Sequence, residues 1–136
     1  MKIRKLALVL MFIPVFAFAG KAERDFTTSE AEPAVKEAVA TLKNSCGCDV
    51  AFDVKFDTFK DLNELWLVKR FANAIKDGAE PYCSDAASKA AMCNLKTIEF
   101  SKGSDVTFEF KDGKGTATAD SSSYPSWDMV TRAVDK

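Results

Sequence analysis

The residues of this sequence whose type and spacing could carry chemistry are its four cysteines, Cys46, Cys48, Cys83 and Cys93. The close pair Cys46-Gly47-Cys48 could exchange disulfides if one sulfur were exposed and its pKa were lowered by a cation or a helix N-terminus. The neighbours Ser45 and Asp49 do not favour a thiolate. A zinc site is also disfavoured, because one intervening residue is shorter than the usual separation of zinc ligands. Two structural disulfides are therefore the preferred interpretation.

Distance limits how these cysteines pair. If residues 83–93 form a helix, its ends lie roughly 15 Å apart, whereas bridged Cα atoms lie about 4.4–6.8 Å apart. A bridge between Cys83 and Cys93 would also leave Cys46 and Cys48 to close a tight ring. We therefore expect the first two cysteines to be bridged to the last two, and both ways of joining them stay open.

Other reactive groups form no convincing site. The sequence has no histidine, which is the commonest general base and metal ligand, so the serines at positions 121–123 lack an obvious base. Asp49, Asp53 and Asp57 are four residues apart, and along a strand this spacing separates them by roughly 13 Å, too far to share one ion. We therefore expect no catalytic residue, no metal site and no cofactor.

Aromatic residues beside prolines are the remaining candidates for a functional surface. Tyr82 follows Pro81 in one expected loop, and Tyr124 and Trp127 flank Pro125 in another. Aromatic side chains on rigid loops often anchor a protein partner. The alternative is that Trp127 packs on the sheet and the tyrosines cover its edges.

The first nineteen residues have the pattern of a secretory signal peptide. A basic start precedes the apolar run 6–18, and Ala17 and Ala19 occupy the positions that signal peptidase reads. The run is shorter than the roughly 20 residues that span a bilayer. We expect cleavage before Gly20, which leaves residues 20–136 as one domain without a membrane span, in the periplasm or outside the cell.

The charge of the mature chain argues against two classes of partner. Loss of the signal leaves 16 of the 19 basic residues against 20 acidic ones, a net charge of about −4. Nucleic-acid binding depends on the neutralisation of phosphates by Lys and Arg. We therefore expect neither a nucleic acid nor an anionic membrane surface as the partner.

Periodicity, capping residues and turn residues predict four helices and four strands after a loose polar leader over residues 21–28. The expected elements are a helix from Ser29 or Pro33 to about 43, a strand over 46–57, a helix from Asp57 or Thr58 to about 76 closed by Gly78, a short helix over 85–92 capped by Ser84, strands over 95–100, 106–111 and 116–119 in a meander, and a helix from Pro125 or Ser126 to 134.

Two of these elements have a clear apolar face. The first helix is expected to bury the stripe Ala31, Val35, Ala38, Val39 and Leu42, and the first strand the alternate residues Cys46, Cys48, Val50, Phe52, Val54 and Phe56. The order α-β-α-α-β-β-β-α indicates a two-layer α+β domain, with a mostly antiparallel sheet of about four strands covered on one face by helices and stapled by disulfides.

These observations favour a non-catalytic protein that binds another envelope or extracellular protein, as an inhibitor or an immunity-type factor does. One alternative is a thiol-disulfide redox protein that uses Cys46-Gly47-Cys48. The other is a carrier that holds a small apolar ligand between the sheet and the helices.

The signal sequence makes a direct prediction about the mature protein. Because Ala17 and Ala19 fit the peptidase, the exported chain should begin at Gly20. Intact mass spectrometry of the purified protein measures this, and a mass that retains Met1 would contradict it.

Overall fold

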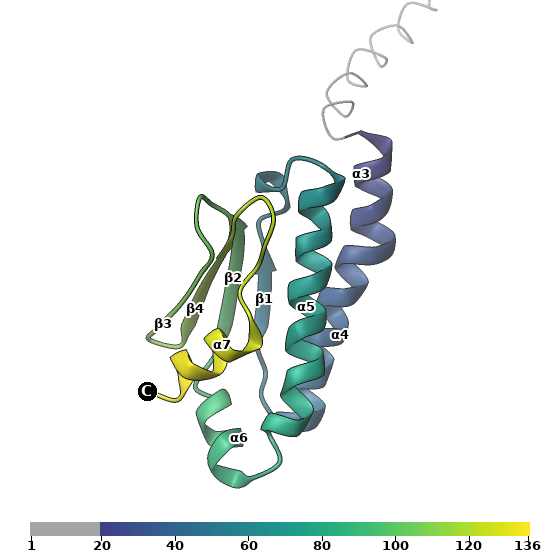
Figure 1. The fold of residues 1–136 in the computed structure, drawn as a ribbon. Coiled ribbons are helices and arrows are strands. Elements are labelled where there is room, and N and C mark those ends of the chain that lie inside the picture. Colours follow the sequence, from purple (N-terminus) through teal and green to yellow (C-terminus); the bar gives the residue numbers. More distant parts are fainter. Residues whose placement is uncertain (1–19) are drawn as a thin grey trace, which may run out of the picture.

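The computed structural model describes residues 20–136, so the predicted signal peptide lies outside the described residues. The chain forms an α+β domain of two layers, with a four-stranded sheet on one side and helices on the other (Figure 1). The elements are α3 (Lys21–Phe26), η1 (Thr27–Ala31), α4 (Glu32–Thr41), η2 (Leu42–Cys46), β1 (Ala51–Val54), η3 (Phe56–Thr58), α5 (Leu62–Tyr82), α6 (Ala86–Met92), β2 (Thr97–Lys102), β3 (Thr107–Lys111), β4 (Lys114–Ala119) and α7 (Trp127–Val134).

The first four elements join into one helical arm, residues 21–46, whose junctions keep right-handed helical dihedrals. The predicted loose leader is therefore wrong. Phe26 gives this segment an apolar contact, because its ring lies 4.9 Å from the Trp66 ring of α5. The predicted helix start at Ser29 or Pro33 falls inside the arm. The π-helical turn η1 directly precedes α4, whose Pro33 has no N–H to donate to the preceding turn.

The sheet has the strand order β1-β2-β4-β3. Strand β2 is parallel to β1 and to β4, and only β3 and β4 are antiparallel. The predicted hairpin at Asp112-Gly113 is confirmed, with positive φ at both residues, but the mostly antiparallel meander is wrong because β4 lies between β2 and β3.

The composition of β4 explains its central place. Its inward residues are Gly115, Ala117 and Ala119, and all three are buried. A Cβ at Gly115 would meet the Phe108 ring at 2.5 Å and Leu95 at 3.0 Å. Small side chains on the middle strand thus leave room for large ones from its neighbours.

One face of the sheet carries the core. Helix α5 lies over β1 and β2, and the ring centroids of Phe71 on α5 and Phe100 on β2 are 4.6 Å apart. Helix α7 contacts β3 and buries Val130 and Val134. The opposite face is polar and open to solvent. Two exposed residues on it are Lys114 and Thr116.

Helix α5 departs from the prediction at both ends. Its N-cap is Asp61, whose carboxylate accepts the Glu64 N–H at 2.9 Å, and the predicted caps Asp57 and Thr58 lie in η3 instead. At the other end the helix continues past Gly78 to Tyr82. Gly78 does not end the helix; it leaves space for Trp127, whose indole would overlap any Cβ at this position.

The remaining helix starts agree closely with the sequence. Asp85, one residue beyond the predicted Ser84, caps α6 by accepting the Ser88 N–H at 2.8 Å. Ser126 caps α7 by accepting the Met129 N–H at 3.2 Å, as one of the two predicted starts required. Short polar side chains commonly satisfy the first free N–H groups of a helix in this way.

The contact between Gly78 and Trp127 predicts an unusual sign for a helical Gly→Ala change. Alanine normally stabilises a helix interior by about 1 kcal/mol relative to glycine, but overpacking costs about 1–3 kcal/mol. We expect Gly78→Ala to lower the free energy of unfolding by up to about 2 kcal/mol, the difference between these two effects, measured by chemical denaturation.

Gly103→Ala is the matched control, because a Cβ there would only reach ordinary contact with Thr118 at 3.4 Å. This variant should unfold at the denaturant concentration of the unchanged protein or above it. A stabilised Gly78→Ala would show that Trp127 does not pack on this turn.

Candidate functional site

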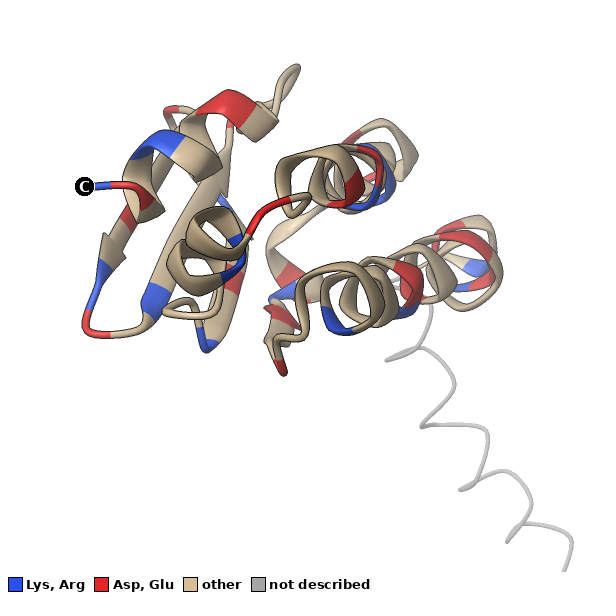
Figure 2. Ribbon diagram, turned by 90° about the horizontal axis from the view of Figure 1, so that it is seen from below, with Lys and Arg blue, Asp and Glu red and all other residues tan. Residues whose placement is uncertain are grey.

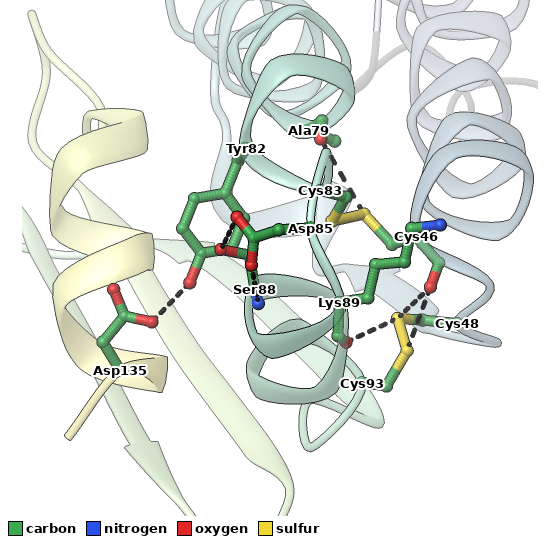
Figure 3. Close-up of a disulfide and its surroundings, with 10 residues drawn as sticks. All are labelled: Cys46, Cys48, Ala79, Tyr82, Cys83, Asp85, Ser88, Lys89, Cys93 and Asp135. Atoms are coloured by element: carbon green, nitrogen blue, oxygen red, sulfur yellow. Dashed lines mark hydrogen bonds between the residues drawn. A yellow bond between two sulfur atoms is a disulfide. The ribbon is translucent and has the colours of Figure 1, made fainter.

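The four cysteines meet at the corner where the arm turns into the first strand (Figure 3). Cys46 is bridged to Cys83 at the end of α5, and Cys48 is bridged to Cys93 at the end of α6, with Cα separations of 5.2 and 4.9 Å. The predicted joining of the first two cysteines to the last two is confirmed, and the structure chooses between the two pairings left open. We call residues 46–48 the cysteine corner.

The bridges at the cysteine corner are shielded from solvent. Cys46, Cys48 and Cys83 are each 3% exposed, Cys93 is half-buried, and none of the cysteines among residues 20–136 is free. A sulfur that takes part in thiol-disulfide exchange must be reached by an attacking thiolate. This burial supports a structural role. Two disulfides are also compatible with a location outside the cytoplasm.

The aromatic residues singled out in the sequence come together in part. Tyr82 and Trp127 stack edge to face with centroids 5.9 Å apart, and the Tyr82 hydroxyl donates to Asp135 after the last helix (Figure 3). Tyr124 is half-buried against the core. Two of these side chains thus hold α7 against α5, and their role as partner anchors stays a prediction.

The environment of Tyr82 raises the pKa of its hydroxyl from 10.0 to about 12, first by burial and then by the hydrogen bond to Asp135 and its charge. The folded state therefore favours the protonated tyrosine. This contribution to stability is complete below the ordinary pKa and is lost as the pH rises from 10.0 towards 12.

Several carboxylates have local partners. Asp49 accepts from the Lys43 ammonium at 2.8 Å, which lowers the pKa of the aspartate, and Asp53 pairs with Lys55 at 2.7 Å. Asp120 accepts the backbone N–H groups of the serine loop that follows it, and these bonds lower its pKa. Within residues 20–136 no three His, Cys, Asp or Glu side chains are grouped to hold a metal ion.

Charges of both signs are interspersed over the helices and strands (Figure 2). Most ion pairs are exposed, and such pairs contribute little to stability; Lys21 with Asp25 and Arg132 with Asp128 are examples. Among the helices of the described part of the chain, none has the length and apolar character needed to cross a bilayer.

A furrow runs between the helical arm and β1, and the sequence did not predict it. Its central section has a volume of about 400 Å³. We call it the edge groove, and its apolar lining is Val35, Val39, Phe52, Val54 and Phe56. All five side chains are half-buried.

The periodicity of the arm contains the signal for this groove. The stripe that packs against α5 is Ala31, Ala34, Ala38 and Leu42, which are all at most 5% exposed. Val35 and Val39 lie beside that stripe and face the strand. The predicted stripe merged these two faces into one, because a helix with a broad apolar surface can bury it on one neighbour or divide it between two.

Comparison of the chain with models of protein families, with curated proteins and with solved structures gives no significant match.

The cysteine corner predicts how the protein responds to loss of a bridge. The Cys48–Cys93 bridge closes a sequence separation of 45 residues, for which chain entropy gives about 4 kcal/mol. We expect the double variant Cys48→Ala with Cys93→Ala to unfold at a much lower denaturant concentration.

The unchanged, non-reduced protein should take up no alkylating reagent, as read by intact mass. Alkylation of four thiols in the folded protein without a reductant would rule out both bridges.

Proposed function

We propose that this protein works outside the cytoplasm as a non-catalytic module that binds another protein, and that the edge groove is its binding surface. The observation that carries the proposal is the groove's lining of five half-buried apolar side chains between an arm and a strand edge. Apolar contacts inside a concave surface, with charged residues at the rim, are the usual anatomy of a protein interface.

The groove is shaped before a partner arrives. Phe52 packs edge to face on Phe71 of the core, with centroids 5.8 Å apart, while its other side lines the groove. The bridge from Cys46 to Cys83 fixes the end of the arm. A preformed surface loses little conformational entropy on binding, and this favours affinity.

The two alternatives have weaker support. A redox function needs an accessible sulfur, and three of the four cysteines are 3% exposed. A carrier of a small apolar ligand normally encloses most of its ligand, whereas the edge groove has walls from the arm and β1 and is open between them.

Site-specific crosslinking tests the proposal in the envelope of the producing cell. A photoreactive benzoylphenylalanine at position 39 should crosslink one partner protein, because this side chain lines the groove. The same group at position 116, exposed on the open face of the sheet, is the control and should not give that product.

Affinity for the crosslinked partner then measures the contribution of the groove. Val39→Asp should weaken binding about thirtyfold, corresponding to about 2 kcal/mol for a true anchor, with an unchanged circular dichroism spectrum. Thr116→Asp should leave affinity unchanged.

Two outcomes would argue for another function or another surface. Loss of binding in Tyr82→Ala or Tyr124→Ala, but not in Val39→Asp, would move the interface to the surface around Tyr82, at the end of α5, and Tyr124. Exchange of a test disulfide well above the rate of glutathione, abolished by Cys46→Ser, would establish the redox alternative.

A further inference from the structure

The open side of β1 has the properties of a template for another strand. Strand β1 is at one edge of the sheet, and its only strand neighbour within residues 20–136 is β2. Ala51 donates its N–H to the Lys96 carbonyl just before β2 at 2.9 Å, and Lys55 donates to the Phe100 carbonyl of β2 at 2.8 Å. Because alternate residues of a strand point their backbone groups to opposite edges, the N–H and C=O groups of Phe52 and Val54 point away from the sheet.

The edge groove lies beside these outward backbone groups. The side chains of Phe52 and Val54 form one wall, and Val35 and Val39 of α4 form the other. A segment that pairs with β1 would direct every second side chain into this apolar space, since side chains of a strand alternate between its two faces. Backbone pairing supplies affinity in such strand addition, and the pockets supply specificity.

The groove is long enough for a segment of useful length. A second hollow of about 520 Å³ shares Phe56 with it and reaches α3, and a third of about 320 Å³ shares Val39 with it and reaches Cys48 of the cysteine corner. The wall from Arg24 to Lys43 follows the helical arm. At the helical rise this wall is roughly 30 Å long, which matches about nine extended residues.

Charge distinguishes the two ends. Near the start of β1 the hollow is lined by Lys43 and Lys96, which share the single carboxylate of Asp49. Positive charge is thus in excess there. At the other end Glu23 and Asp57 are matched by Arg24 and Lys60. An occupant with an acidic group near Ala51 complements this asymmetry.

We propose that the edge groove takes an extended segment of another protein, which adds to β1 as a further strand with apolar side chains at alternate positions in the groove and an acidic group beside Lys43 and Lys96. This inference rests on the proposed function and names the chemistry of its partner. The occupant is an extended segment because only an extended backbone pairs with the outward groups of Phe52 and Val54.

A random peptide library displayed on phage, selected on the folded mature protein, supplies the probe. Selected peptides should converge on alternating apolar positions with an acidic residue at one end. In a synthetic copy of the best binder, methylation of single backbone nitrogens should weaken binding at every second position, roughly tenfold to hundredfold, because each methyl removes one N–H donor. Recovery of no binder, or sensitivity without this alternation, would overturn the inference.

A substitution in the protein tests the same pairing from the other side. Val54→Pro removes an N–H that β2 does not use, and proline is tolerated where the N–H of an edge strand faces solvent. It should weaken peptide binding roughly tenfold or more. Val54→Ala is the matched control: it removes the side chain from the wall of the groove but keeps the N–H, so it should weaken binding less than Val54→Pro. Should Val54→Pro unfold, the methylation pattern still decides.

The outcomes separate this inference from the proposed function. If Val39→Asp abolishes binding while Val54→Pro and the methylated peptides bind normally, the groove binds a protein without strand addition, and only the inference fails. Binding unaffected by all three changes contradicts both. If analytical ultracentrifugation shows a dimer that Val54→Pro dissociates, the occupant of the groove is a second copy of the chain. If native mass spectrometry shows a bound small ligand, the protein is a carrier. Each of these results overturns the inference.

Discussion

The cysteine corner is the constraint on which the other elements depend. Gly47 has a φ of 77°, a conformation that residues with a Cβ rarely adopt, and it turns the chain from the arm towards β1. One bridge then fixes the end of the arm to the end of α5, and the other fixes the approach to β1 to the end of α6. The bridges thereby hold together segments that are 37 and 45 residues apart in sequence. The helical arm and β1, which form the two walls of the edge groove, both adjoin the cysteine corner.

The local chemistry of this chain could be read from its sequence. The alternation around Phe52 was enough to predict a strand with one face towards the helices, and Asp112-Gly113 was enough to predict a hairpin, because both signals act between residues close in sequence. The predicted bounds 46–57 were wrong, since the strand covers only Ala51–Val54, with Cys46 at the end of η2 and Phe56 in η3. The cysteine connections were narrowed by the dimensions of a helix. They could not be resolved further, since both pairings bring the same four residues together.

The errors occurred where distant residues decide the outcome. Gly78 has the local character of a helix end, but Trp127, far along the chain, packs on it inside a continuous helix. The order of the strands depends on which strand lies between the others, and the small inward residues of β4 suit that place. Periodicity shows which residues of a strand share a face, but it does not show which strands are neighbours. The edge groove was missed for a similar reason: a half-buried valine and a fully buried one look alike in a sequence.

The place of β4 has a consequence for the order in which the molecule can be completed. It is the last strand in the chain, yet it joins the parallel pair β1 and β2 to β3. A chain emerging from its N-terminus has all four cysteines available at residue 93, before any residue of β4 has appeared. The two disulfides can therefore form around the helices before β4 is present in the sheet. Strand β4 is then the last to be added, and it inserts between β2 and β3.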